Sequence, residues 1–465
     1  MTDVNLLIRT QYEEYPFPNV LPRDERRRLQ MVPVDSLGNI NHICFKGRRI
    51  FDENFRVLVA GGGTGHSTIY LAEQLRDSGA EVVYLDLSQA SMVVAQERAK
   101  LRGLDNIKWV CGSITDLPTM ALGPFDYISC TGVLHHLPDP NRGLQALKSV
   151  LKVDGAMGIM VYATYGRQSY YHIQALMEQL NEPNECLKRK IINTREAMES
   201  MPSHFYLAHG IHRDRHLKGF FEDDSNLVDT FLHSQDRSYT IPELYKWLED
   251  NELSFNDFSN FNATMIEKIQ YCPELYLEQG KLLSRVQEKP LRERHAIAEL
   301  LNSRIGLHTF YVSAEQKSQA RPTDPHMVPY FAEMYLGGKS VFQQFTPTEL
   351  SDQIRANTGE TFSVLHAGGL NLELVVGPHS ADILGELDGK RTIREIFSNV
   401  RKKYEGRFLP TQALFDDFSR IFSVCSAVEW MRLRHVDCSV PRTYDEMQNK
   451  LFRAPDAVSN IVNAA

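Results

Sequence analysis

Three glycines at alternate positions, Gly61, Gly63 and Gly65, directly follow an apolar run that is typical of a buried strand. Glycines between a strand and a helix let the backbone turn sharply and approach a ligand closely, with the helix N-terminus directed at that ligand. The dinucleotide-binding pattern GxGxxG would need its third glycine where this chain has His66. The GxGxG spacing, followed 21 positions later by Asp86, instead favours a ligand that joins a nucleoside to an amino acid, with its ribose hydroxyls on the carboxylate.

Cysteines and histidines give little support for a metal site. The seven cysteines show no CxxC spacing, which argues against a zinc site, and their odd number argues against a disulfide framework. Four histidines lie between residues 204 and 216, and the last three could share one helix face in the manner of metal ligands. No nearby cysteine or fixed carboxylate pair completes that set, so we predict no metal site. The four residues are His204, His209, His212 and His216.

Composition limits the classes of protein to which the chain can belong. With 465 residues, 42% of them hydrophobic and 24% charged, it is long enough for two or three domains. No apolar run approaches the roughly 20 residues of a membrane span, and the first residues lack the pattern of a signal peptide. We therefore expect a cytoplasmic protein without a membrane partner. The net charge of -8 argues against general nucleic-acid binding.

Short apolar runs alternate with amphipathic helical patterns between residues 55 and 163. This alternation predicts an α/β fold with right-handed crossovers and a parallel sheet that is covered on both faces. Two later strand-like runs are expected to close the sheet as an antiparallel edge pair, with helices between them. The predicted strands are 56–61, 81–86, 107–112, 125–130 and 155–163 in the parallel part, and 253–259 and 307–313 at the edge.

Changes of pattern along the chain predict six segments. They are an N-terminal arm (1–50), a ligand-binding core (51–165), a helical insertion with the closing strands (166–315), a polar, proline-containing linker (316–340), a small, mostly helical C-terminal domain with a winged-helix-like pattern (341–440) and a loosely held tail (441–465). The linker predicts that a chain ending near Glu315 folds on its own.

Four segments, in this order, resemble the motifs of the class I S-adenosylmethionine-dependent methyltransferases. They are VAGGGTG at 59–65, VVYLDLS at 82–88, VCGSITDLP at 110–118 and FDYISCTGVLHHLPDP at 125–140. The resemblance covers about residues 11–313. It implies a Rossmann-like, seven-stranded sheet with S-adenosylmethionine as the bound methyl donor.

The resemblance also implies which residues bind the donor. The glycines would pack under its methionine and ribose portions, and Asp86 would accept hydrogen bonds from the ribose hydroxyls; the alternative role for Asp86 is a helix cap. Ser113 stands where the family usually has an aspartate for the adenine amino group, and Val59 replaces a common acidic residue, which leaves the contact to the donor's ammonium partly unassigned. The implied donor-binding residues are Gly61, Gly63, Gly65, Asp86, Leu87, Ser113, Ile114 and Thr131.

Three residues are candidates for catalysis. In this family the loop after the fourth strand borders the acceptor, so His135, or its neighbour His136, could orient or deprotonate it. A histidine held by the backbone is an equal alternative. The arm QYEEYPFP at 11–18 is similar to arms in a subset of these enzymes, and Tyr12 or Tyr15 could hold a cationic acceptor through its ring face. Alternatively, both tyrosines only attach the arm to the domain.

A closer resemblance, in segments such as 59–75 and 155–181, is to bacterial protein-lysine methyltransferases that act on outer-membrane proteins in rickettsiae. It implies a lysine acceptor, extra domains and a homodimer. The same arm and core occur in tetratricopeptide-linked methyltransferases of unknown substrate, so a protein acceptor and a small-molecule acceptor both stay open. A further alternative, from another class, is a scaffold that senses the donor without using it.

Overall fold

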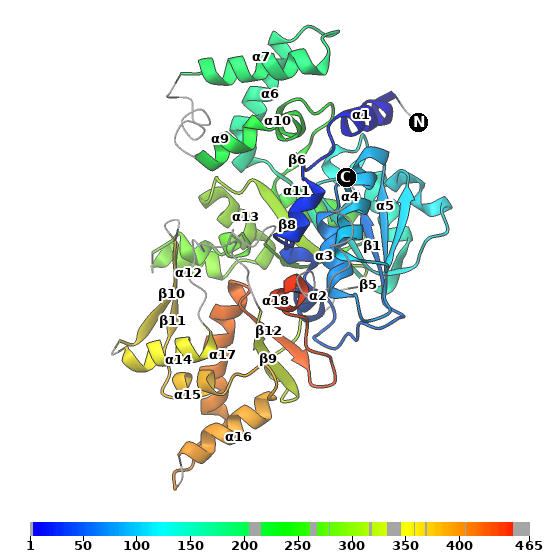
Figure 1. Cartoon of the computed structure of the whole chain (residues 1–465). Coiled ribbons are helices and arrows are strands. Elements are labelled where there is room, and N and C mark those ends of the chain that lie inside the picture. The colour runs from blue at the N-terminus through cyan, green and yellow to red at the C-terminus, as the bar shows by residue number, and fades with distance from the viewer. Residues whose placement is uncertain are drawn as a thin grey trace, which may run out of the picture.

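A computed structural model of the chain describes residues 3–202, 204, 215–260, 267–278, 280–315, 319–332, 346–357, 359–367, 370–404 and 406–449. Its centre is one large sheet with the strand order β3-β2-β1-β4-β5-β8-β7, and β6 pairs with β5 (Figure 1). The strands are β1 (Arg56–Ala60), β2 (Glu81–Asp86), β3 (Ile107–Cys111), β4 (Phe125–Thr131), β5 (Leu151–Ala163), β6 (Ser238–Tyr239), β7 (Ser254–Phe258) and β8 (Leu307–Ser313).

The predicted parallel sheet with an antiparallel edge is confirmed. Strands β1 to β5 pair in parallel, whereas β8 runs antiparallel to both β5 and β7. The short β6, which the sequence pattern did not reveal, pairs in parallel with the end of β5. The strand order reverses between β1 and β4, and open α/β sheets bind ligands outside the carboxyl ends of the strands at such a point.

Helices cover both faces of the sheet, as the Rossmann-like prediction requires. Because side chains alternate along a strand, Val57 and Val59 of β1 pack with α2, α3 and α4, whereas Leu58 and Ala60 pack with α5 and α11. These helices are α2 (Leu37–Cys44), α3 (His66–Gln74), α4 (Gln89–Arg102), α5 (Pro140–Ser149) and α11 (Ile241–Asp250). The helices on both faces thus fix the positions of the carboxyl ends of β1 and β4.

A helical insertion forms a layer of its own at the top of Figure 1, beside α1 (Asp3–Glu14). Its helices bury a separate apolar cluster that includes Ile173, Ile191 and Phe231. They are α6 (Gln168–Leu180), α7 (Leu187–Ser200), α9 (Arg215–Glu222) and α10 (Asp224–Phe231); α12 (Lys281–Gln287) and α13 (Leu291–Leu301) follow between the edge strands. Within the ranges that the structure describes, no helix is both long and apolar enough to cross a membrane.

The C-terminal unit occupies the lower end of Figure 1 and has its own buried cluster. The predicted linker is wrong in part, because Met327 and Val328 are buried and belong to a strand that pairs with the last strand of the unit. Pro329 is tolerated because this ribbon has only two strands, whose outer edges need no further partner. The elements are β9 (Met327–Phe331), α14 (Pro347–Ala356), β10 (Thr361–Ala367), β11 (Leu370–Val375), α15 (Ser380–Gly385), α16 (Ile393–Lys403), α17 (Thr411–Ala427) and β12 (Met431–His435).

The end of the predicted arm and the start of the predicted tail both belong to the main core, which corrects two predicted boundaries. In the predicted arm, Ile40 and Ile43 of α2 are fully buried in the cluster beneath β1. In the predicted loose tail, α18 (Tyr444–Asn449) buries Tyr444 and Met447 in the same cluster. Neither segment is long enough to show a clear amphipathic period, so its burial depends on tertiary contacts.

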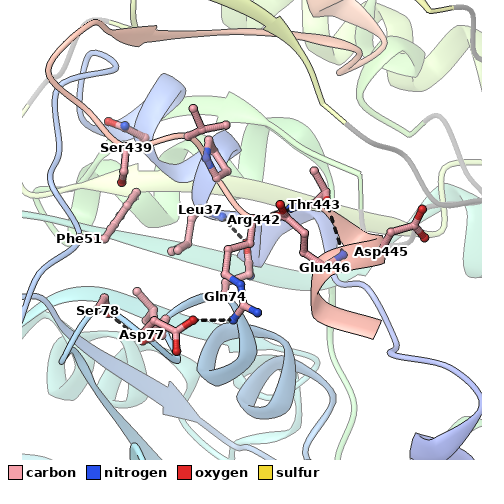
Figure 2. Close-up of a pocket in the computed structure, with 14 residues that line it drawn as sticks. Leu37, Phe51, Gln74, Asp77, Ser78, Ser439, Arg442, Thr443, Asp445 and Glu446 are labelled. Atoms are coloured by element: carbon pink, nitrogen blue, oxygen red, sulfur yellow. Dashed lines mark hydrogen bonds and ion pairs between the residues drawn. The ribbon is translucent and has the colours of Figure 1, made fainter. Parts of the chain in front are cut away.

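Figure 2 shows a surface pocket where this C-terminal segment meets α3. Arg442 points to Asp77, 3.6 Å away, and Gln74 lines the same pocket. Gln74 ends α3, about 13 Å along the helix from the glycines that precede it, at 1.5 Å per residue. The pocket therefore belongs to the attachment of the C-terminal segment and lies apart from the crevice at β1 and β4.

Candidate functional site

The carboxyl ends of β1, β2 and β4 bring the predicted donor-binding residues together. The backbone N–H of Gly63 donates to Asp86 Oδ2 at 2.7 Å, and that of Gly61 donates to the carbonyl oxygen of Leu85 at 2.8 Å. Val133, in the loop after β4, lies so close that a Cβ on Gly61 would come within 2.3 Å of its Cγ2 atom. Three motifs that are far apart in the sequence therefore form one continuous surface.

Each of the three glycines is required for a different contact. Their φ angles are +77° at Gly61, +49° at Gly63 and +101° at Gly65, a region that other residues rarely adopt. A Cβ on Gly63 would lie 2.7 Å from the carbonyl oxygen of Phe17, and one on Gly65 would lie 2.8 Å from the Cβ of Ala95. The glycines thus admit the loop after β4, the N-terminal arm and the neighbouring helix α4, in that order.

Asp86 has free capacity to bind a ligand. Its Oδ2 accepts from Gly63 and its Oδ1 accepts the N–H of Ser88 at 2.8 Å. A carboxylate offers about four acceptor positions, so both oxygens can still accept from ribose hydroxyls. Burial raises the pKa of Asp86 above its ordinary value, while these N–H donors oppose that shift. The alternative role as a helix cap is excluded, because Ser88 caps α4.

The other predicted donor-binding residues follow the same edge of the sheet. Leu87 comes directly after β2, and Thr131 ends β4; both are partly exposed. Ser113 caps the short helix Ile114–Thr119, since its Oγ accepts the N–H of Thr115 at 3.3 Å. Ile114 is buried. The location agrees with the prediction, and the contacts of these residues with the donor stay predictions.

The N-terminal arm lies over the glycine loop. Thr64 donates its N–H to the carbonyl oxygen of Phe17 at 3.2 Å and its hydroxyl to that of Pro18 at 2.7 Å. Glu13 accepts the N–H groups of Gln89 and Ala90 at the start of α4, at 2.7 and 3.0 Å. The arm is thus fastened on both sides of the glycines.

The structure separates the two tyrosines of the arm. The hydroxyl of Tyr12 donates to Asp229 Oδ1 at 2.9 Å, and its backbone carbonyl accepts from the hydroxyl of Ser88 at 3.1 Å. Tyr15 instead packs on the apolar cluster of the helical insertion. Tyr12 therefore connects the donor edge with α10, whereas Tyr15 occupies the place expected of a residue that attaches the arm.

Three histidines gather close to Tyr12. The ring of His136 stacks on that of His233 with 3.8 Å between centroids, and His135 contacts the ring of Tyr162 at 3.8 Å. The side chain of His135 is fully buried, and neither of its ring nitrogens has a hydrogen-bond partner. Burial lowers the pKa of His136 to about 4 and that of His233 to about 3, so both rings are neutral at pH 7.

The backbone N–H and carbonyl groups of Gln235 orient two of these rings. Its carbonyl oxygen lies 2.9 Å from Nδ1 of His136, and its N–H donates to Nδ1 of His233 at 3.0 Å. In neutral rings this places the proton of His136 on Nδ1 and that of His233 on Nε2. The pair therefore presents a bare Nε2 that can accept a proton, on His136, next to an N–H donor on His233.

Asp229 completes this polar cluster, by which we mean Tyr12, His136, Asp229 and His233. Its second oxygen accepts from the hydroxyl of Tyr162 at 3.4 Å, and burial raises the pKa of its carboxyl group. One ligand atom from each of His136, Asp229 and His233 lies within 4.8 Å of the other two, an arrangement that a metal ion could also use. The proton on His233 Nε2 and the stacked rings favour hydrogen bonding instead.

Sequence reasoning missed Asp229 and His233. Both come from the insertion, and Tyr12 and Asp229 are separated by 217 positions, so no local spacing joins them. Of the four histidines considered between residues 204 and 216, His204 is exposed. His209, His212 and the side chain of His216 lie outside the described residues. An acid and a histidine four positions apart at the end of a helix were the only available signal.

Comparison with known proteins agrees with this geometry. A family model described as a methyltransferase domain matches residues 58–157. An uncharacterized protein of Synechococcus is 32% identical over 259 residues, which is 55% of this chain and 60% of that protein. The tRNA 5-carboxymethoxyuridine methyltransferase of Escherichia coli is 34% identical over 24% of this chain and 42% of that enzyme. The chain thus spans about half the length of these curated relatives.

Among solved structures, PKMT2 from Rickettsia typhi has a similar fold. It aligns with a TM-score of 0.59 over 88% of this chain and 76% of that one, at 14% sequence identity. Because the alignment covers most of the chain, the likeness of fold extends beyond the sheet to the insertion and the C-terminal unit. At this identity the comparison concerns the fold alone.

Proposed function

We propose that this chain, whose residues 58–157 match a methyltransferase-domain model, is a class I S-adenosylmethionine-dependent methyltransferase that transfers a methyl group to an acceptor held at the polar cluster. The observation that supports this proposal is the pair of contacts made by Tyr12. Its carbonyl binds Ser88, next to the carboxylate that fits the donor's ribose, and its hydroxyl binds Asp229 in the cluster. A donor on the glycine loop and an acceptor at the cluster would therefore face each other across one side chain.

The residues at the crevice fit S-adenosylmethionine. The three glycines let the loop after β4, the arm and α4 close in around the end of β1, and Asp86 there keeps acceptor positions for the ribose hydroxyls. When bound there, the donor would supply an activated sulfonium methyl group for transfer to the acceptor's nucleophilic atom, with S-adenosylhomocysteine as the leaving group. The chain's own contribution is to hold the reactants in line, to exclude water with the arm and to remove a proton from the acceptor.

His136 is the residue best placed to remove that proton. Its Nδ1–H donates to Gln235, which leaves its bare Nε2 for the cluster. Its low pKa keeps the imidazole ring neutral at pH 7, so Nε2 is free to accept a proton. His233 can donate a hydrogen bond to the acceptor, and Asp229 can receive one. The predicted His135 lies behind this surface, where its buried ring contacts Tyr162 and His136.

Two acceptors fit this arrangement. A lysine amine is favoured by the Asp229 carboxylate and the ring of Tyr12, since both attract an ammonium group that must lose a proton before it can attack. A small molecule with an acidic N–H or O–H is favoured by the burial of the cluster. The curated relatives include a tRNA methyltransferase and ubiquinone biosynthesis O-methyltransferases.

A transfer assay with labelled donor tests the proposal. Labelled S-adenosylmethionine is mixed with the full chain and cell extract, and the label is then measured in the protein and small-molecule fractions. We expect His136→Gln to lower transfer by roughly a hundredfold or more, because a positioned base contributes about 10²–10⁴-fold, with unchanged affinity for S-adenosylhomocysteine. The matched control is His204→Gln, at an exposed histidine. Tight donor binding without transfer to any fraction would favour the donor-sensing scaffold.

A further inference from the structure

A buried cation beside the polar cluster has no ionic partner among the described residues. Arg167, in the turn after β5, is only 8% exposed, and its Nε and Nη2 groups have no hydrogen-bond partner. No carboxylate of the described residues lies within 4.0 Å of its guanidinium group. The buried Arg98 and Arg102 both pair with Glu25, and the buried Arg434 donates to the carbonyl oxygens of Cys438 and Gly389. Burial lowers the pKa of Arg167, but Tyr162 and Asp236 raise it above its ordinary value, so the side chain keeps its charge, and its unpartnered N–H groups indicate a missing anion.

Arg167 lies next to the polar cluster. Its guanidinium carbon is 3.4 Å from the ring centroid of Tyr162 and 4.9 Å from that of Tyr170. The hydroxyl of Tyr162 binds Asp229 on the other side. One aromatic ring therefore separates the unpaired guanidinium from the residues that would hold the reacting atom of the acceptor.

Asp236 does not neutralise this charge at contact distance. It interacts electrostatically with Arg167, but its Oδ2 is held by the side-chain amide of Gln174 at 3.0 Å. Its Oδ1 is buried and has no hydrogen-bond partner. Arg167 thus keeps N–H groups, and Asp236 an oxygen, that a ligand with an anionic end and a hydrogen-bond donor could satisfy.

We propose that Arg167 binds an oxyanion of the methyl acceptor, either a carboxylate or a phosphate group. This inference rests on the proposed function and names the class of its substrate. The planar fork of the guanidinium suits bidentate pairing with such an anion. The acceptor is then a small acidic molecule whose nucleophilic atom lies a few ångströms from its anionic group. Of the two acceptors considered above, Arg167 favours the small molecule over a lysine side chain.

Thermal unfolding of the full chain, saturated with S-adenosylhomocysteine, tests this assignment. Sodium acetate and inorganic phosphate are each compared with chloride at equal ionic strength. We expect at least one of them to raise the unfolding temperature of the wild-type protein and to have no such effect on Arg167→Met. Arg237→Met is the matched control, because Arg237 is exposed and lies 4.9 Å over the ring of Tyr239; its response should equal that of the wild type. The anion that acts distinguishes a carboxylate from a phosphate.

A second measurement needs no ligand. Without added anion, Arg167→Met should unfold at the same temperature as the wild type or higher, because it removes an unpaired buried charge. A lower unfolding temperature would show that the chain itself balances this charge and would overturn the inference, as would an anion effect that persists in Arg167→Met. Calorimetry with S-adenosylhomocysteine separates the two proposals, because loss of donor binding in the wild type contradicts the proposed function instead.

Discussion

Asp86 offers the most direct test at the scale of single residues. Replacing it with alanine removes charge-assisted hydrogen bonds to the ribose, each worth about 1.5–3 kcal/mol, so affinity for S-adenosylhomocysteine should fall about tenfold to more than a hundredfold. Isothermal calorimetry measures this change. Asp116→Ala is the control, since Asp116 is an exposed acid on the same edge of the sheet. Equal affinities of the two variants would contradict the assignment of the donor site.

Asp35 gives a pH-dependent prediction. It is fully buried beneath β4, and burial raises its pKa to about 6 although Ser67, Ser129 and Tyr127 donate to it. The folded state thus retains a proton that the unfolded chain releases near pH 4, so this group destabilises the fold as pH rises from about 4 to about 6.

The variant Asp35→Asn should remove that effect. The free energy of unfolding of the variant, relative to wild type, should increase by roughly 1–2 kcal/mol between pH 5 and pH 7.5, since one pKa unit corresponds to about 1.4 kcal/mol. Urea unfolding at several pH values measures this difference, and the comparison cancels the opposite effects of other buried groups such as His136. A pH-independent difference would show that Asp35 has similar pKa values in both states.

At the scale of elements, the arm depends on one buried carboxylate. Glu25, in the short helix Pro22–Arg26, binds the guanidinium groups of Arg98 and Arg102 in α4. Arg98 also donates to the carbonyl oxygen of Thr64 in the glycine loop at 2.7 Å. The same network therefore joins the arm, α4 and the donor loop.

Removing that carboxylate leaves Arg98 without an ionic partner and Arg102 with Glu73 alone, at 3.5 Å. We expect Glu25→Gln to lower the free energy of unfolding by about 3–5 kcal/mol and to weaken S-adenosylhomocysteine binding through the glycine loop. Chemical denaturation and calorimetry report the two effects. Glu293→Gln, which breaks the exposed pair with Lys289, should cost less than about 1 kcal/mol. Similar losses in both variants would argue against a supporting role for the network.

At the scale of the whole molecule, the C-terminal unit is tied to the core around the large sheet. The backbone N–H of Leu433 donates to Nδ1 of His42 at 3.1 Å, and Gln448 accepts the N–H of Leu29 at 2.8 Å. Arg432 is fully buried and donates to Asn39. These contacts reverse the expectation that a chain ending near Glu315 folds on its own.

A chain truncated at Glu315 should therefore be insoluble or unfold at a clearly lower temperature than the full chain, because it exposes apolar surface of α2 and of the cluster beneath β1. Circular dichroism during heating measures the loss. A chain that ends at Asn449 retains every described C-terminal contact and is expected to melt like the full chain. Equal melting of all three chains would restore the predicted linker as a domain boundary.

The sequence by itself determined the sheet, its strand limits to within a few residues, and the edge at which the glycines and Asp86 meet. These features follow from local periodicity and from a topology that collects strand ends at one edge. Only the tertiary structure decided that residues 29–44 and α18 belong to the core, that Tyr12 and Tyr15 diverge, and that Asp229, His233 and Arg167 lie beside the acceptor loop. Such contacts join residues up to several hundred positions apart. In the sequence these are ordinary polar residues, and only folding removes them from water and leaves them with specific partners or with none.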